Sequence, residues 1–282
     1  MSVSPLTARK TWRTLEPIHG FIYFAPEAVD AYAALGVTGR SGYFASRSAP
    51  LGAVPPEVVI ATFFNFEPGL VRRSMDGVWG NVTPVALLGA RLIAAGAMLR
   101  RVMGDAAPTP DVEEAAGLAR AAAERAVLHL SGKPLFAAHA SLPWPDDPLL
   151  VLWHAQSLLR EFRGDIHVAA LCSEGIDGCE ALVTHAASGD IARALLQTSR
   201  GWSDEEWRAA VDSLRAKGHL DAEGSFTAEG RASRQRIEDQ TDMGAAVAYE
   251  AISEDGCDRL RALCRPISKA VAGDPGFGIR AR

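Results

Sequence analysis

The stretch from Trp202 to Arg231 constrains the fold of this chain more than any other. Ser203, with Glu206 three residues later, is a capping box that begins a helix. Apolar residues at helical spacing follow, and Gly218 is placed to end that helix in a left-handed conformation. A short glycine-containing turn then separates two segments that can pair as a hairpin, before another helix begins. This order predicts a winged helix-turn-helix in which the first helix is the recognition helix.

A weaker copy of the same pattern lies in the first half of the chain. The segments that begin at Leu35 and Glu174 share a GxxG turn, a short helix and a basic residue. Residues from Val58 onward align with those from Ala194 onward, in the same order along the chain. Collinear similarity of this kind predicts an internal duplication, and chance similarity between alanine-rich helices is the alternative.

The predicted fold is therefore mainly α: a tandem, pseudo-twofold winged helix-turn-helix with small β-hairpin wings. The chain has 282 residues, of which 48% are hydrophobic, and it can bury the core of two packed domains. A weaker counterpart of the hairpin is expected near residues 78–82. The predicted parts are an N-terminal helix-turn-helix copy at 1–105, a helix plus a proline-rich connecting segment at 106–148, and a C-terminal winged-helix copy with exit helices at 149–282. Within the connecting segment, residues 131–148 are expected to be irregular but packed, since they are rich in both proline and apolar residues.

Composition indicates a cytoplasmic protein with no membrane segment. The first residues contain no apolar targeting stretch, and no apolar run approaches the ~20 residues that span a bilayer. The four cysteines form no CxxC pair, so reduced thiols buried on helix faces are expected.

Charge argues against a strong nucleic-acid role. The formal net charge is −5, whereas a dedicated DNA-binding protein usually carries a basic surface. The first turn of the expected recognition helix is acidic, which repels phosphate. If DNA is bound, the expected contacts are arginines on the two equivalent helices: Arg72, Arg73, Arg208 and Arg215.

The densest polar cluster lies on the expected helix from Leu149 to Cys172. At 100° per residue, His154, Glu161 and Asp165 share one face of that helix. Apolar flanks place the helix in the core, so its charges need partners or a ligand. Other polar residues expected to converge there complete a predicted ligand-binding set: Glu16, His19, Tyr23, Arg47, His139, Trp144, His154, Arg160, Glu161, Arg163, Asp165, His167 and His185.

Three interpretations of this cluster remain open on the sequence alone. It is a network of ion pairs that joins the two copies, a pocket for a small anionic or aromatic molecule, or an acid–base or metal site. His154 and Glu161 stand seven residues apart, unlike the i, i+4 pair of a metalloprotease helix, so no metal site is predicted. The sequence identifies no cofactor and no nucleophile motif.

Several stretches resemble an actinobacterial helix-turn-helix family, and the resemblance covers nearly the whole chain. They are WRTLEPIHGFIYFAPEA, GYFASRSAPLGAVPPEVVIATFFNF, LPWPDDPLLVLWHAQSLLREFRGDIHVAAL, and RGWSDEEW with FTAEGR after it. The C-terminal third is similar to MarR-type winged-helix regulators. The resemblance implies a MarR-like fold and a regulator that acts as a homodimer, or as a monomer in which the duplication mimics a dimer. It supplies no catalytic residues.

The leading functional hypothesis is a MarR-like regulator that binds a small molecule between the two copies, with DNA as a further partner weakened by the acidic recognition helix. The alternative is an enzyme on a repurposed helix-turn-helix scaffold, with the histidine, carboxylate and arginine cluster as its acid–base or metal site.

Overall fold

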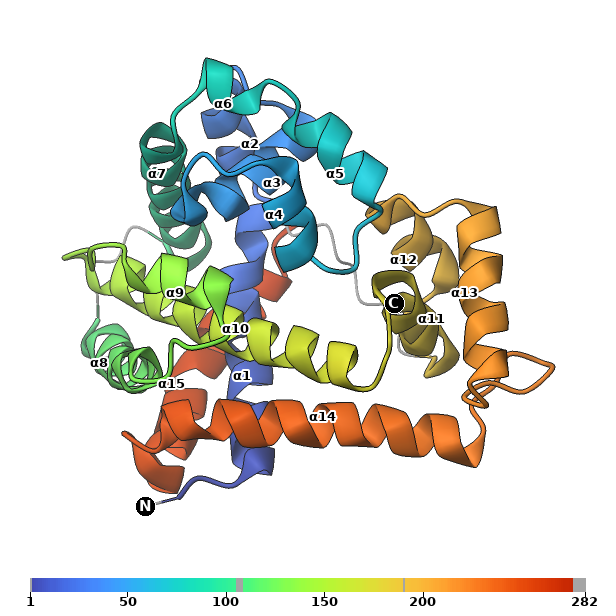
Figure 1. Cartoon of the computed structure of the whole chain (residues 1–282). Helices are drawn as coiled ribbons and strands as arrows, with labels where there is room; N and C mark the ends of the chain where they lie inside the picture. The colour runs from blue at the N-terminus through green and yellow to red at the C-terminus, as the bar shows by residue number, and fades with distance from the viewer. Residues whose placement is uncertain (1, 105–108, 190, 276–282) are drawn as a thin grey trace. The chain divides into compact units, whose positions relative to one another are not determined.

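A computed structural model describes residues 2–104, 109–189 and 191–275 of the chain (Figure 1). Parts of the predicted segments, at 105–108 and 276–282, lie outside these described residues. The chain divides into two compact units, each described here by itself. Unit 1 spans residues 1–54, 77–165 and 242–282, and unit 2 spans residues 55–76 and 166–241. Two long helices, α10 (Pro148–Ser173) and α14 (Ala228–Tyr249), contribute residues to both units.

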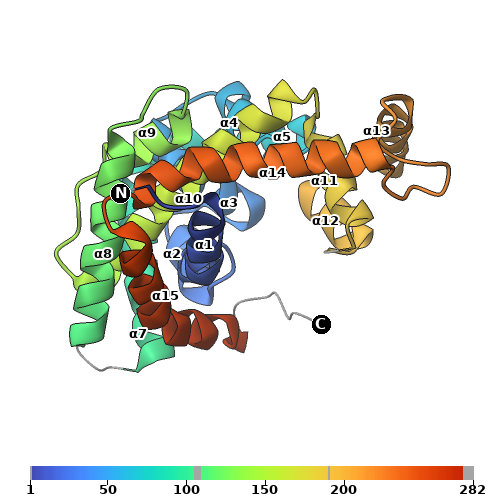
Figure 2. The same ribbon diagram turned by 90° about the horizontal axis from the view of Figure 1, so that it is seen from below.

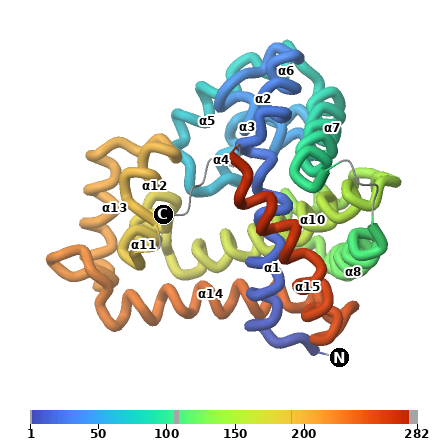
Figure 3. Tube along the Cα trace, turned by 180° about the vertical axis from the view of Figure 1, so that it is seen from behind, coloured from blue at the N-terminus to red at the C-terminus, as the bar shows by residue number. Residues whose placement is uncertain are grey.

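The regular secondary structure of unit 1 is entirely helical within its described residues. Besides its parts of α10 and α14, it contains α1 (Pro5–Gly20), η1 (Phe21–Tyr23), α2 (Pro26–Ala33), α3 (Gly39–Ser48), η2 (Ala49–Leu51), α6 (Val78–Asn81), α7 (Pro84–Met103), α8 (Pro110–Val127), α9 (Pro134–Ala140) and α15 (Ser253–Ala272). Helices α1 and α15 lie side by side, as Figures 2 and 3 show from two directions. Leu15 and Ile18 of α1 and Leu260 and Cys264 of α15 are all buried. Burying apolar side chains of this size contributes about 1.5–3 kcal/mol each.

Unit 2 contains the helix-turn-helix elements. Its helices, besides its parts of α10 and α14, are α4 (Pro56–Thr62), α5 (Pro68–Met75), α11 (Gly178–Ala187), α12 (Arg193–Arg200) and α13 (Asp204–Ala216). One apolar core joins α11, α12, α13 and the first part of α14, with Leu182, Leu196, Trp207, Leu214 and Ile237 among its buried members.

The local signals around α13 are confirmed in detail. The Ser203 hydroxyl accepts a hydrogen bond from the Glu206 amide, and the Glu206 carboxylate accepts one from the Ser203 amide. Gly218 adopts φ +74°, which favours glycine, directly after the helix. The Thr227 hydroxyl accepts a hydrogen bond from the amide of Gly230 and so caps α14.

The segment between α13 and α14, residues 217–227, is a tight turn that we call the hairpin (Figure 1). Leu220 and Phe226 form one isolated antiparallel β-bridge, and no strand is present in the described part of the chain. The structure therefore shows a mainly helical protein, while the winged hairpins and the tandem duplication stay predictions.

Two local expectations were wrong. Residues 78–81 form the short helix α6 rather than a hairpin, because Gly77 turns the chain with φ +65° and the indole nitrogen of Trp79 donates to the carbonyl of Val54. The segment 131–148 contains a helix, α9, because Pro134 stands in its first turn, where a missing amide costs nothing. The expected packing of this segment is confirmed, since Leu135 and Phe136 are buried.

Among the described residues no single helix is long and apolar enough to cross a membrane, and one bent combination, residues 68–81 with α7, reaches that length and composition only when taken together.

The capping box predicts a measurable stability change. Ser203→Ala removes the acceptor for the Glu206 amide and is expected to lower the free energy of unfolding of unit 2 by about 1 kcal/mol. Chemical denaturation followed by circular dichroism measures this loss. Ser203→Asp retains a capping oxygen, so it is the control and is expected to stay near wild type. Ser213, on the same helix, is unsuitable as a control because its hydroxyl donates to Glu180.

Candidate functional site

Glu161 is the central charge of a buried polar cluster in unit 1. Its carboxylate, on α10, is 1% exposed and accepts hydrogen bonds from Arg47 of α3 and Arg160 of α10, both at 3.0 Å. Arg160 also donates to Glu16 of α1 at 3.0 Å. Burial alone would raise the pKa of Glu161, yet the charges of Arg47 and Arg160 hold that pKa well below its usual value.

A hydrogen-bonded chain of neutral groups runs beside Glu161. The Ser157 hydroxyl donates to the carbonyl of Trp153 (2.9 Å), so it accepts from Nδ1 of His19 (2.8 Å). Nε2 of His19 then accepts from the Tyr23 hydroxyl at 2.6 Å. Burial lowers the pKa of His19 well below its usual value, with the charge of Arg160 adding to the effect, so this imidazole is neutral at pH 7.

Two further histidines of the cluster are buried and neutral. His139, on α9, donates from Nδ1 to the carbonyl of Leu135 at 2.9 Å. His154, on α10, meets the ring of Trp144 edge-on with 4.8 Å between ring centroids. Burial lowers the pKa of each imidazole to about 4.

Asp165 is the last acidic member of the predicted face. Its carboxylate accepts a hydrogen bond from the amide of Phe136 at 2.9 Å, and burial raises its pKa to about 6. His154, Glu161 and Asp165 are all buried, as the helical spacing led us to expect. Arg163 has a separate partner: it donates to Asp242 at 2.8 Å, and its guanidinium lies 4.2 Å from the ring centre of Trp12.

Arg91 is a member of this cluster that the predicted set lacks. It lies on α7 and is 2% exposed. Its guanidinium carbon is 5.6 Å from the ring centre of Tyr23 and 5.5 Å from that of Trp153. The sequence did contain a signal, since Arg91 stands four residues from both Leu87 and Ala95 on the buried face of an apolar helix.

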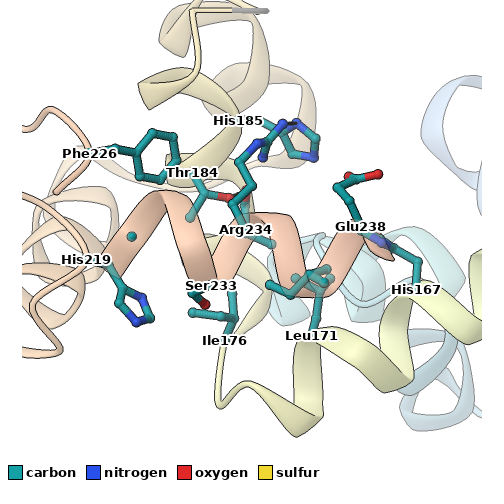
Figure 4. Close-up of a pocket in the computed structure, with 13 residues that line it drawn as sticks. His167, Leu171, Ile176, Thr184, His185, His219, Phe226, Ser233, Arg234 and Glu238 are labelled. Atoms are coloured by element: carbon teal, nitrogen blue, oxygen red, sulfur yellow. Dashed lines mark hydrogen bonds between the residues drawn. The ribbon is translucent and has the colours of Figure 1, made fainter. Parts of the chain in front are cut away.

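The remaining predicted residues, His167 and His185, belong to unit 2 and line a pocket there (Figure 4). The pocket lies between the end of α10, α11, the hairpin and α14. Its apolar wall includes Leu171, Ile176 and Ile237. His167 contacts the Thr241 hydroxyl at 3.0 Å.

A cationic edge and the hairpin complete this pocket. Nη2 of Arg234 lies 3.4 Å from Nδ1 of His185, and Figure 4 shows the two side chains meeting on one side. His219 and Phe226 enter from the hairpin. Gly230 is required there, because a Cβ at this position would lie 2.0 Å from the carbonyl oxygen of His219. Helical periodicity could not reveal this pocket, since the hairpin residues that line it lie outside any regular repeat.

Comparison with known proteins places the chain in a family. A family model described as "Helix-turn-helix family" matches residues 8–277. The chain belongs to this helix-turn-helix family. No curated protein and no solved structure matches it. Membership suggests a DNA-binding protein of the regulator type, while the MarR-like and actinobacterial parts of the resemblance stay predictions.

A helix-turn-helix protein reads DNA with its second, recognition helix. The present partners of the predicted arginines therefore matter for DNA binding. Arg208 donates to the carbonyl of Asp204 at 3.1 Å. Arg215 donates to the carbonyls of Asp221 and Ala222, at 3.1 and 2.7 Å, and so ties the hairpin to α13.

The two arginines of α5 pair with carboxylates. Arg72 contacts Glu57 at 3.2 Å, and Arg73 contacts Glu67 at 3.4 Å. Arg72 and Arg73 are exposed, and an ion pair at the surface is worth about 0–1 kcal/mol, so a phosphate can replace either carboxylate partner at small cost. Within the described ranges, no three His, Cys, Asp or Glu side chains are grouped to hold a metal ion.

Proposed function

We propose that this chain is a ligand-responsive regulator that binds a small, partly apolar anion in the pocket of unit 2 and binds DNA weakly through its helix-turn-helix. The observation that carries the proposal is the composition of that pocket, in which apolar walls stand beside the Arg234–His185 edge, with the carboxylate of Glu238 one helical turn from Arg234. A pocket with mostly apolar walls and a few convergent polar groups is the usual form of a small-molecule site.

The position of the pocket supports a regulatory role. His219 and Phe226 belong to the hairpin, and Ser233 and Arg234 belong to the helix that follows it. A ligand in this pocket contacts the hairpin directly, and Arg215 ties the hairpin to α13. If DNA binding moves α13 or the hairpin, the contacts of the ligand differ between the free and the DNA-bound protein. Differential contact of this kind is what a ligand needs in order to shift a DNA-binding equilibrium.

The MarR-like and duplicated character belongs to this proposal. Under it, the helices of residues 1–105 and those of residues 149–282 descend from one helix-turn-helix unit, and the protein acts as a homodimer or as a monomer that mimics one. Light scattering of the purified protein distinguishes these two states.

DNA binding is tested by fluorescence anisotropy with a labelled duplex from the region upstream of the protein's own gene. We expect specific binding at low salt that weakens as salt rises, with a shallow slope because few cations face the DNA. A scrambled duplex of equal length is the control. Equal affinity for the two duplexes would contradict the assignment of this protein as a regulator.

The pocket is tested with anilinonaphthalene sulfonate, a fluorescent aromatic anion. We expect saturable binding that lowers the affinity for the duplex, and about tenfold weaker binding to Arg234→Met, from the loss of a charged hydrogen bond. Arg236→Met on the same helix is a matched control, since Arg236 pairs with Glu174 and does not line the pocket. Unchanged dye affinity in Arg234→Met would contradict the pocket assignment.

An enzyme on this scaffold is the second candidate. It is favoured by the neutral imidazoles of His139 and His154 and by the carboxyl of Asp165, whose pKa of about 6 suits a proton donor near neutral pH. Metal analysis and an absorbance spectrum of the purified protein test for a bound metal or coloured cofactor. Incubation with carboxylate esters and amides, with His154→Gln as the control, tests for acid–base hydrolysis.

A further inference from the structure

Arg91 carries a buried positive charge with which no described carboxylate forms a hydrogen bond. Both terminal nitrogens of its guanidinium are shielded from solvent and have no hydrogen-bond partner among the described residues. The rings of Tyr23 and Trp153 flank the guanidinium. Such contacts contribute about 0.5–2 kcal/mol, which is less than the several kcal/mol that burying an unpaired ion costs.

The surrounding charges do not supply the missing partner. Arg47 and Arg160 share the buried carboxylate of Glu161, and Arg160 also holds Glu16. The third carboxylate of the cluster, Asp165, accepts a hydrogen bond from the amide of Phe136, so Arg91 has no carboxylate partner among the described residues.

Other polar atoms of the cluster are shielded and without partners in the same way. They are the indole nitrogen of Trp153 and Nε2 of both His139 and His154. Trp153 is one of the two rings beside Arg91, and the charge of Arg91 lowers the pKa of both histidines. A native protein leaves few buried polar atoms unsatisfied, so a group of them around one cation indicates a ligand.

We propose that the Arg91 cluster of unit 1 binds a small monoanionic carboxylate that also carries a hydroxyl group. A guanidinium with two unpartnered terminal nitrogens matches a carboxylate in a bidentate pair. The flanking rings favour a flat, apolar body next to that carboxylate. Both terminal nitrogens of Arg91 lack a partner among the described residues, so one carboxylate satisfies this guanidinium and a monoanion is favoured over a dianion.

His139 is the reason that we expect a hydroxyl group on the ligand. Its Nδ1 donates to the carbonyl of Leu135, so in the neutral ring Nε2 carries the lone pair and accepts. An acceptor at this position needs a donor from the ligand. This site lies in unit 1 and is independent of the pocket proposed in unit 2, so either assignment can fail alone.

Isothermal titration calorimetry of the full chain with 4-hydroxybenzoate, benzoate and inorganic phosphate tests the proposal. We expect 4-hydroxybenzoate to bind more tightly than benzoate, and phosphate to bind more weakly than either. Arg91→Met should weaken 4-hydroxybenzoate about tenfold or more, whereas Arg100→Met, on the exposed side of α7, should leave it unchanged. Arg234→Met should also leave it unchanged, which separates this site from the pocket of unit 2.

Stability without added acid provides a second measurement. Because Arg91→Met replaces an unpaired charge by an apolar side chain of similar length, the variant should melt at the same temperature as wild type or higher. A marked fall in its melting temperature would show that the guanidinium is satisfied within the protein and would overturn the proposal. Absence of carboxylate binding to wild type, or equal binding to Arg91→Met, would overturn it as well.

Discussion

Glu161→Ala is expected to lower the free energy of unfolding of unit 1 by about 3–5 kcal/mol. Glu161 is the shared acceptor of Arg47 and Arg160, and its side chain is almost fully buried. Arg47 also donates to the Tyr43 hydroxyl at 3.1 Å, but this neutral group does not balance the charge of the guanidinium. Most of this loss is the free-energy cost of leaving buried arginine charges unpaired. The ion pairs themselves contribute little net stability, because the cost of desolvating the charges cancels much of their attraction.

Chemical denaturation followed by circular dichroism measures this loss, and amide hydrogen exchange along α10 assigns it to unit 1. Glu161→Gln keeps a carbonyl acceptor and is expected to lose less than the alanine variant. Glu124→Ala breaks an exposed i, i+4 pair with Arg120 and is expected to cost no more than about 0.5 kcal/mol. A loss of that small size in Glu161→Ala would contradict the role given to the central carboxylate.

The elements that the sequence predicted well are those whose signals are local. The capping box at Ser203, the left-handed Gly218 and the cap at Thr227 each act within a few residues, so they place α13 and the start of α14 without knowledge of the fold. The expected burial of cysteines on helix faces is confirmed for Cys179, Cys257 and Cys264, but it was wrong for Cys172, which is exposed near the end of α10.

The misplaced elements had signals that two structures could satisfy. Apolar residues at 78–82 suit a hairpin as well as a short helix, and the left-handed Gly77 decides for the helix. Several prolines suggested an irregular segment before α10, although a proline such as Pro134 also starts a helix readily.

The candidate site was predictable only in part, because helical spacing gives the face of a residue and not its neighbours. It placed His154, Glu161 and Asp165 on one buried face of α10. It could not show that His167, two residues after Asp165, belongs to another compact unit. Arg91 was missed because the rest of the buried face of α7 is apolar, although a single charge on such a face is itself a signal.

Acidification from pH 7 to pH 5 is expected to destabilise unit 1 by about 3 kcal/mol or more. His139 and His154 have pKa values lowered from 6.5 to about 4. Their neutral forms therefore stabilise the fold above pH 6.5, and this stability is lost as the pH falls from 6.5 towards 4. Each histidine contributes about 2 kcal/mol to the loss by pH 5, since one pKa unit corresponds to about 1.4 kcal/mol. His19, whose pKa is also lowered by burial, adds to it.

The carboxyl group of Asp165 changes the stability in the opposite direction on acidification. Its pKa is raised from 3.8 to about 6, so the folded protein takes up a proton there as the pH falls through 6, which offsets about 1 kcal/mol of the loss. Asp165→Asn should therefore steepen the acid loss, and His154→Gln should make it shallower. Urea denaturation at half-unit steps from pH 7 to pH 5 measures both slopes. Equal stability at pH 7 and pH 5 in the wild-type protein would show that these imidazoles reach a proton source in the folded state. The buried cluster would then be hydrated, and the lack of a partner assigned to Arg91 would have to be revised with it.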